Sequence, residues 1–228
     1  SISTIGSAMK TPLRFLLTTL LCCINFSFAM ATTEELRIVA LGDSLTACYG
    51  LPQQAAFPAR LEEALRQENY TVKVFNAGVS GDTSQGGLSR LDWALGDQPD
   101  LVIIELGAND AMRGLQPLQT RQNLDNILSQ LRQRNVQALL TGMKAPRNLG
   151  KQYYHQFDRI YPDLAFKHQV PFYPFFLDGV AGVPGLNQSD GIHPTLAGVN
   201  VIVQRIRPLV EEVLSEIAQK KANSCSAD

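Results

Sequence analysis

The chain has 228 residues, of which 45% are hydrophobic and 18% are charged, and its formal net charge at pH 7 is −1. This length and hydrophobic fraction suffice for one well-packed domain and are short for two. The near-neutral charge gives no basis for binding nucleic acid, and the ordinary composition excludes disorder of the whole chain.

The N-terminal segment differs from the rest of the chain. Basic Lys10 and Arg14 precede an apolar stretch, 15–28, which is followed by the small-x-small motif from Ala29 to Ala31. This three-part layout is typical of a secretory signal peptide and predicts cleavage after Ala31. The apolar stretch is shorter than the roughly 20 residues of a spanning helix, which disfavours an uncleaved anchor. We therefore expect a periplasmic or secreted protein with no stable membrane insertion after processing.

From residue 36 onwards, apolar strands alternate with amphipathic helices. The run "LRIVAL" (36–41) is short, apolar and rich in β-branched residues, which predicts a strand. Residues 57–69 carry apolar side chains at helical spacing, and 71–76 again predict a strand. A helix is expected over 83–96, although glycines weaken its start.

The second half of the chain repeats this alternation. Its predicted elements are a central strand at 100–107, a helix at 118–132, a strand at 137–142, a helix at 152–167, an edge strand at 170–175 and a closing helix at 194–219. Pro162 is expected to kink or divide the helix that contains it, and Pro208 to bend the last helix. Pro194 falls in the first turn of that helix, where proline is tolerated.

Five strands alternating with helices predict an α/β fold, with a parallel sheet covered by helices on both faces. No internal repeat or low-complexity linker divides the chain. Residues 1–31 are thus expected to be upstream residues plus the signal peptide, and 32–228 a single domain with a short polar tail. Cys48 and Cys225 are too few for a disulfide framework, although they can pair in an oxidising compartment.

In an open parallel sheet, sites form beyond the carboxyl ends of the strands, and polar, Gly-rich segments follow several of the predicted strands. The first such segment, "GDSL", contains Ser44, a candidate nucleophile. The alternative is that Ser44 caps a short helical turn, which is a common use of serine.

His193 is the candidate general base. Asp190 precedes it by three residues, close enough for a turn to bring its carboxylate to the imidazole and fix the tautomer. Asp190 can also start the following helix, and the two roles are compatible. The other histidines downstream of residue 31, His155 and His168, lie in a charged region and are expected to be exposed.

An acyl-transfer site also needs donors for a developing oxyanion. Three are available: the backbone N–H of Ser44, the backbone N–H of Gly78 and the side-chain amide of Asn109. Glycine at 78 allows a close approach of backbone and substrate. Asn109 can instead stabilise its own loop as an Asx turn.

Four blocks of sequence, taken in order, resemble the SGNH (GDSL) hydrolase family. They are "GDSL", the glycine-containing "NAGVSGDT", "GAND" and "DGIH", and the resemblance extends from residue 36 to about 214. It looks closest to the periplasmic thioesterase, lysophospholipase and arylesterase branch. It implies a flavodoxin-like, three-layer α/β/α sandwich with strand order 2-1-3-4-5. It further implies Ser44 as nucleophile, His193 as base oriented by Asp190, and Ser44, Gly78 and Asn109 as the oxyanion hole.

The function implied is a monomeric, cofactor-independent serine hydrolase that cleaves carboxylic esters and thioesters through an acyl-enzyme, with a small-molecule or lipid substrate. No His/Cys cluster has the spacing of a metal site. Apolar residues of the expected rim loops either line an acyl groove or pack onto the domain itself. These residues are Ala108, Met112, Leu115, Met143, Pro146 and Ile192. The chain departs from the resemblance at Ala108, where many relatives carry glycine.

Two other functions are considered. A carbohydrate O-acetyl esterase of the same family is disfavoured because the rim lacks an evident aromatic platform and Trp93, the single tryptophan, is expected in the core. A non-enzymatic flavodoxin-like binding module is disfavoured because "GDSLTACYG" has neither the Walker nor the dinucleotide-binding glycine pattern.

Overall fold

The five strands form one parallel sheet in the order β2-β1-β3-β4-β5, which confirms the predicted topology. The computed structural model describes residues 34–225, so the predicted signal peptide and its cleavage site lie outside the described residues. The strands are β1 (Leu36–Gly42), β2 (Val72–Gly78), β3 (Leu101–Glu105), β4 (Gln137–Thr141) and β5 (Phe172–Tyr173).

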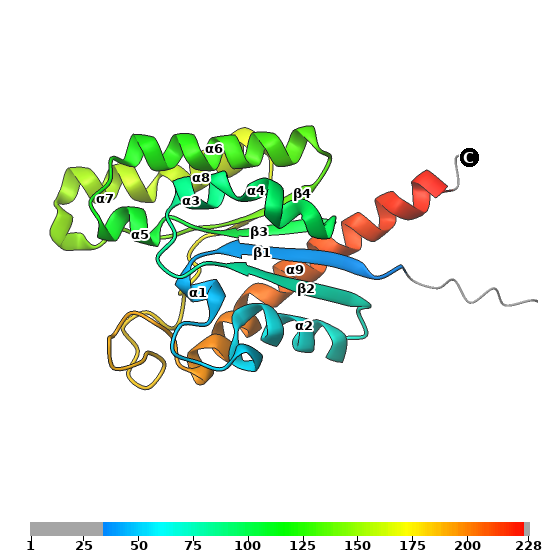
Figure 1. Cartoon of the computed structure of the whole chain (residues 1–228), viewed down its shortest axis with the longest axis horizontal. Coiled ribbons are helices and arrows are strands. Elements are labelled where there is room, and N and C mark those ends of the chain that lie inside the picture. The colour runs from blue at the N-terminus through cyan, green and yellow to red at the C-terminus, as the bar shows by residue number, and fades with distance from the viewer. Residues whose placement is uncertain (1–33, 226–228) are drawn as a thin grey trace, which may run out of the picture. The chain divides into compact units, whose positions relative to one another are not determined.

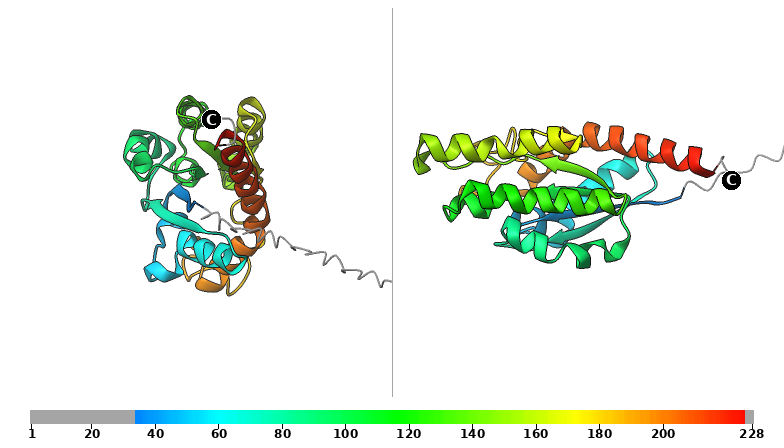
Figure 2. Two further views of the ribbon diagram at one scale, coloured as in Figure 1. Left: turned by 90° about the vertical axis from the view of Figure 1, so that its right-hand side faces the viewer. Right: turned by 90° about the horizontal axis from the view of Figure 1, so that it is seen from above.

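Helices cover both faces of the sheet, as the α/β/α prediction requires (Figures 1 and 2). The α-helices are α1 (Ser44–Ala47), α2 (Phe57–Gln67), α3 (Ser84–Ser89), α4 (Leu91–Ala94), α5 (Ala108–Met112), α6 (Pro117–Gln133), α7 (Lys151–Asp158), α8 (Ile160–His168) and α9 (Leu196–Cys225). Short 3₁₀ turns occupy Gln53–Ala55, Leu95–Asp97 and Arg147–Leu149. Helices α2 and α9 pack together on one face, whereas α3, α6 and α8 cover the other (Figure 1).

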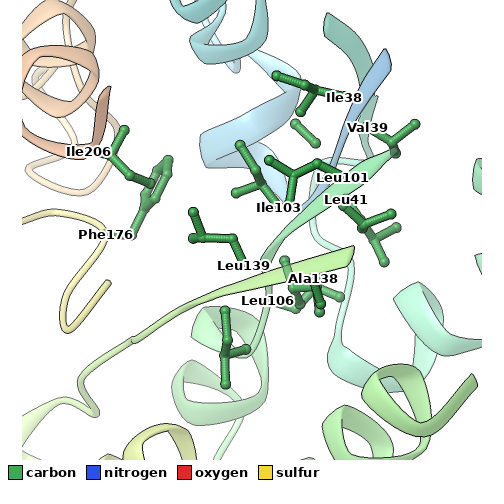
Figure 3. Packing of buried hydrophobic residues seen from close by; sticks show 14 of the residues in the cluster. Ile38, Val39, Leu41, Leu101, Ile103, Leu106, Ala138, Leu139, Phe176 and Ile206 are labelled. Carbon is green, nitrogen blue, oxygen red and sulfur yellow. The ribbon is translucent and has the colours of Figure 1, made fainter. Parts of the chain in front are cut away.

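The core consists of the two faces of β1, β3 and β4 and the helices packed on them. Every residue of β3 is buried, which is the pattern of a central parallel strand. In Figure 3, Ile103 and Leu139 project from neighbouring strands, and Phe176 lies against Ile206 of α9. Each fully buried Leu or Ile contributes about 1.5–3 kcal/mol relative to an exposed one. The strands therefore form a firm base for the residues at their carboxyl ends.

The strand register brings three carboxyl ends together. Gly42, the last residue of β1, pairs with Gly78 of β2 on one side and with Glu105 of β3 on the other. The segments that follow these strands start at the same edge of the sheet. This is the edge at which the sequence places its candidate site.

The helix expected over 83–96 is divided at Arg90. The Arg90 guanidinium donates to the carbonyl oxygens of Gly42 and Ala77 at 2.8 and 2.6 Å, so it binds the ends of two strands. Within the four-residue helix that follows, Leu91 and Ala94 are buried. Trp93 lies on the opposite side and is 67% exposed, so the expectation that it belongs to the core was wrong.

The helix expected over 152–167 is also divided, at Arg159, which separates α7 from α8. Pro162 is the third residue of α8, where its missing N–H breaks no intrahelical hydrogen bond. His155 is exposed, as predicted. His168 is not: its side chain is 6% exposed and its Nε2 lies 2.5 Å from Asp125 Oδ1.

The last two elements also differ from prediction. β5 has only two residues because Pro171 and Pro174, which cannot donate to a ladder, flank it. α9 begins at Leu196 and continues through Pro208. Cys48 is a free cysteine whose thiol donates to the Pro52 carbonyl oxygen at 3.2 Å. The side chain of Cys225, its possible partner, lies outside the part of the chain that the structure describes. Among the described residues, no helix combines the length and hydropathy needed to cross a bilayer.

Candidate active site

Ser44 is the first residue of α1, and Asp43 caps this helix. Asp43 Oδ1 accepts a hydrogen bond from the Leu45 N–H at 3.0 Å, which satisfies a free donor of the first turn. The alternative role of Ser44 as the cap is therefore excluded. Its hydroxyl is free to contact other parts of the chain.

Ser44, His193 and Asp190 form a continuous hydrogen-bonded chain. Ser44 Oγ lies 2.9 Å from His193 Nε2, and His193 Nδ1 lies 2.6 Å from Asp190 Oδ2. With Asp190 accepting from Nδ1–H, the remaining ring nitrogen Nε2 is left as the acceptor for the serine hydroxyl. The structure thus brings together all three residues of the predicted triad.

Asp190 is held in a tight turn that also aims it at the imidazole. Its Oδ1 accepts from the N–H groups of Ile192 and His193 at 2.9 and 3.0 Å. The side-chain hydrogen bond from His193, followed by these backbone donors, lowers the Asp190 pKa to about 2. Asp190 therefore stays ionised near neutral pH. Helix α9 starts only at Leu196, so Asp190 does not act as its cap.

A glutamine that the sequence did not indicate connects the histidine loop to the serine loop. Gln188 Nε2 donates to the carbonyl oxygens of Tyr49 and Pro194 at 2.8 and 3.0 Å, and the Gln188 N–H donates to the His193 carbonyl at 2.7 Å. The Tyr49 ring centroid lies 4.3 Å from that of the imidazole. Both loops that carry the triad are thus held by one side chain.

The three expected oxyanion donors differ in availability. Within the described residues, the Ser44 N–H has no hydrogen-bond partner. The Asn109 amide nitrogen donates to Asp43 Oδ2 and to the Asp82 carbonyl at 3.0 and 2.9 Å. Both N–H groups of the Asn109 amide are thus engaged. These bonds orient the side chain at the same edge of the sheet as Ser44, and one of them must be released or shared before Asn109 can donate to an oxyanion.

Gly78 does not offer a free donor. Its N–H donates to Asn76 Oδ1 at 2.9 Å, and it is the last residue of β2. A Cβ at this position would lie 2.3 Å from the backbone nitrogen of Ala47. Glycine is required here because α1 packs closely on the strand end, and the expected role of Gly78 in the oxyanion hole is not supported.

Gly81, which lies in the same block of sequence, was missed. Its N–H has no hydrogen-bond partner in the part of the chain that the structure describes, and its φ is +81°. It directly precedes Asp82, whose carbonyl holds Asn109. The "NAGVSGDT" block contains two glycines, Gly78 and Gly81. The sequence does not show where the strand ends; in the structure β2 ends at Gly78, so Gly81 lies in the loop beyond it.

Asp110 fixes the short helix that carries Asn109. Its Oδ2 accepts from the Ser84 N–H at 2.8 Å, and its Oδ1 accepts from the hydroxyls of Ser84 and Thr120 at 2.5 and 3.0 Å. These buried bonds join α5 to α3 and α6. They hold Asn109 at a constant position relative to the sheet.

A cleft of about 140 Å³ opens beside Ser44. Five of the six expected substrate-binding residues line it, namely Ala108, Met112, Met143, Pro146 and Ile192. Leu115 does not: it is half-buried outside the cleft, and its carbonyl accepts from the Tyr153 hydroxyl at 2.7 Å. Leu45, Lys144 and Leu177 were not expected and also line the cleft. The Lys144 ammonium lies 4.6 Å from the centroid of the Phe175 ring.

Comparison with known proteins identifies the family of the chain. Residues 40–201 match the model of the GDSL-like lipase/acylhydrolase family. The chain is 40% identical over 193 residues to Esterase TesA of Pseudomonas aeruginosa, covering 84% of this chain and 96% of that protein. It is 43% identical over 172 residues to the thioesterase 1/protease 1/lysophospholipase L1 of Escherichia coli K12, covering 75% and 80%.

Solved structures extend the likeness to three dimensions. The psychrotrophic esterase EstA from a Pseudoalteromonas species, in a structure inhibited by monoethylphosphonate, matches with a TM-score of 0.75 at 30% identity. The match covers 79% of this chain and 100% of EstA. The chain therefore belongs to the GDSL-like lipase/acylhydrolase family.

Proposed function

We propose that the protein is a serine hydrolase that cleaves carboxylic esters and thioesters through an acyl-enzyme intermediate. The observation that carries this proposal is the hydrogen-bonded chain from Ser44 through His193 to Asp190. Nucleophile, base and orienting carboxylate are present in one geometry, and membership of the hydrolase family supports the same chemistry.

The reaction proceeds in two halves. His193 Nε2 takes the proton of Ser44, whose Oγ bonds to the acyl carbon while the carbonyl electrons move onto oxygen. Collapse of this intermediate breaks the bond to the leaving alcohol or thiol, which receives the proton from His193. Water then repeats the sequence on the acyl-enzyme. Asp190 stabilises the imidazolium in both halves.

We propose that the oxyanion is stabilised by the N–H groups of Ser44 and Gly81 and by the Asn109 amide. The first two donors are without partners in the described part of the chain, whereas Asn109 must exchange or share its hydrogen bond to the Asp82 carbonyl to reach the oxyanion. Gly81 takes the place that we had expected for Gly78. Loss of one donor of this kind costs about 3 kcal/mol of transition-state stabilisation. Asn109→Ala is therefore expected to lower kcat about a hundredfold or more.

The apolar lining of the cleft supports substrates with medium to long acyl chains. Ala108, Met112, Met143, Pro146 and Ile192 present apolar surface beside Ser44. The names of the relatives include esterase, thioesterase and lysophospholipase, which fit esters and thioesters with an acyl chain.

Hydrolysis of p-nitrophenyl acetate, butyrate, octanoate and palmitate tests this proposal. We expect a maximum above acetate and loss of activity in Ser44→Ala. Ser215→Ala, which changes an exposed serine of α9, is the matched control and should retain full activity. Activity that survives in Ser44→Ala contradicts the nucleophile, and a sharp preference for acetate contradicts the acyl cleft and favours an O-acetyl esterase.

We also propose that residues 1–31 direct the protein to the periplasm or the medium and that cleavage follows Ala31. The charged start, apolar stretch and small residues of this segment support export. N-terminal sequencing of the protein isolated from the periplasm should begin at Thr32. An uncleaved N-terminus would contradict the proposal. Size-exclusion chromatography of the same sample tests the proposed monomer.

A further inference from the structure

Two carboxyl groups are buried directly beneath the nucleophile. Asp43 is 0% exposed and immediately precedes Ser44. Glu105 is 1% exposed and ends β3, where it pairs in register with Gly42. The proposed reaction assigns no role to either side chain. A buried acidic pair with no assigned role requires an explanation, because burial of charge is costly.

Glu105 contacts the chain on both sides of Ser44. Its Oε2 accepts from the Asp43 N–H at 3.2 Å and from the Thr46 hydroxyl at 2.9 Å. A Cβ on Gly42 would lie 2.7 Å from this Oε2 and 2.0 Å from the Thr46 hydroxyl oxygen. The glycine of the "GDSL" block thus makes room for Glu105. Its second oxygen, Oε1, is buried and accepts no hydrogen bond from any described residue.

Asp43 links the nucleophile to the oxyanion donor. Its Oδ1 holds the Leu45 N–H at 3.0 Å, which fixes the first turn of α1. Its Oδ2 holds the Asn109 amide at 3.0 Å. A displacement of Asp43 would therefore move the Ser44 backbone and the Asn109 side chain together.

The surroundings supply little positive charge to the pair. The titratable and charged side chains nearest the pair are Tyr161 from α8 and His193 from the loop before α9, which interact with it electrostatically, and Arg90 between α3 and α4, which binds the neighbouring Gly42 carbonyl. Arg90 donates to the Gly42 carbonyl but is paired with Asp82 at 2.6 Å. No cation in the described residues hydrogen-bonds either carboxyl group.

Two adjacent buried carboxyls without a cation cannot both be ionised near neutral pH. Burial raises the pKa of both groups, that of Asp43 to about 6. The charge on Asp43 raises the Glu105 pKa further. The hydrogen bonds from the Thr46 hydroxyl and the Asp43 N–H lower it, and the side-chain hydrogen bond with Asp43 raises it while lowering the Asp43 pKa. Each carboxyl group accepts two further hydrogen bonds, but those to Asp43 are shared between its two oxygens, whereas both bonds to Glu105 go to Oε2 and Oε1 accepts none. The proton therefore belongs on Glu105.

We propose that Glu105 is a positioning residue for catalysis, a neutral carboxylic acid that donates a hydrogen bond to the Asp43 carboxylate and thereby holds Ser44 and Asn109 in place. Its catalytic consequence rests on the proposed function, because Ser44 and Asn109 must act in the reaction. Its charge state does not, since protonation can be observed directly in the purified protein.

Three substitutions separate this role from general packing. Glu105→Gln keeps a neutral group, with an NH₂ that donates to Asp43 and a carbonyl that accepts in place of Oε2, so we expect kcat within about threefold of wild type. Glu105→Ala removes the donor and leaves the Asp43 carboxylate unsupported, so kcat should fall at least about tenfold. Asp43→Asn should lower kcat by a similar factor or more, with little change in KM.

Infrared spectroscopy at neutral pH supplies the readout that packing alone would not move. The wild-type spectrum should contain the carbonyl stretch of a buried protonated carboxylic acid, and Glu105→Gln should remove it. Glu216→Gln, which changes an exposed glutamate of α9, should leave the band and kcat unchanged. Thermal unfolding of each variant shows that it is folded.

Rescue by Gln but not by Ala, together with loss of the band in Glu105→Gln, supports the proposal. Absence of the band in wild type, or a loss of kcat in Glu105→Gln as large as that in Glu105→Ala, overturns it. Activity remaining in Ser44→Ala would overturn the proposed function, yet the infrared result on Glu105 would still stand. The two failures are thus distinguishable.

Discussion

At the scale of single residues, the imidazole of His193 depends on its partner for both orientation and tautomer. The 2.6 Å contact with Asp190 leaves Nε2 as the acceptor towards Ser44. Because the hydrogen bonds that Asp190 receives lower its pKa to about 2, this carboxylate does not titrate in the range where most enzymes are assayed. Its contribution to stability is present above its ordinary pKa near 4 and is lost as the pH falls towards about 2.

Asp190→Asn tests this dependence. An asparagine keeps the shape but presents an NH₂ that disfavours the productive tautomer, so we expect kcat to fall by about 10³–10⁴ with KM nearly unchanged. Steady-state kinetics on a p-nitrophenyl ester measures both. Asp178→Asn, which changes an exposed carboxylate paired with Arg205, is the control. A fall in kcat of less than tenfold in Asp190→Asn would mean that the turn alone orients the imidazole.

Because Lys144 lines an otherwise apolar cleft, we predict that the protein discriminates between acyl chains with and without a negative charge. Its ammonium is exposed and contacts the Phe175 ring, so it can attract a negative group on the substrate. For acyl chains of equal length, we expect Lys144→Glu to lower the ratio of kcat/KM for a chain ending in carboxylate to that for a chain ending in methyl. The expected factor is about ten, or about 1.4 kcal/mol.

Added salt should weaken the wild-type preference for the charged chain, because screening acts on exposed charges. Lys151→Glu, an exposed lysine outside the cleft lining, should leave the ratio unchanged. An unchanged ratio in Lys144→Glu would show that Lys144 does not meet the substrate.

At the scale of elements, the two loops that carry the triad are held together by Gln188. Gln188→Ala removes its two side-chain donations to the Tyr49 and Pro194 carbonyls. Each such hydrogen bond contributes about 0.5–1.5 kcal/mol, so we expect kcat to fall about three- to tenfold. Hydrogen exchange in the segment around His193 should become faster.

Gln119→Ala, on an exposed face of α6, serves as the control. Unchanged exchange around His193 in Gln188→Ala would show that the loops hold their positions independently.

Much of the fold and of the catalytic triad could be predicted from patterns of residues that are close in the sequence. Alternating strands and helices indicated the layers, and the order of four short motifs indicated the triad. The elements that differ were decided by contacts across the fold. The helix is divided at Arg90, whose guanidinium binds the ends of two strands, and the available glycine is Gly81 because β2 extends to Gly78. Neither Gln188 nor Glu105 has a local pattern that marks it, since each acts on residues distant in sequence.

At the scale of the whole molecule, the buried acidic pair predicts how stability changes with pH. The folded protein binds a proton more tightly than the unfolded chain wherever burial raises a carboxyl pKa, as it does for Asp43, to about 6, and for Glu105, well above its ordinary range. From about pH 4 upwards, the free energy of unfolding should therefore decrease as the pH rises, by at most about 1.4 kcal/mol per pH unit for each retained proton.

Urea denaturation at a series of pH values measures this slope, and Glu105→Gln should reduce it, because one of the two titrating groups is gone. An equal slope in wild type and variant would show that the pKa of Glu105 is the same in the folded and the unfolded protein. The remaining slope in the variant belongs to Asp43 and the surface carboxylates.

The exposed position of Trp93 determines what fluorescence can report. As the single indole of the chain, 67% exposed on α4, it already emits from an aqueous environment in the native state. Unfolding should shift its emission maximum little. A denaturation curve plotted from the position of that maximum would therefore be nearly flat, while the circular dichroism signal of the helices is lost. The same indole would respond strongly to any molecule that covers α4. Tryptophan emission in this protein is therefore a detector of surface contacts and not of folding.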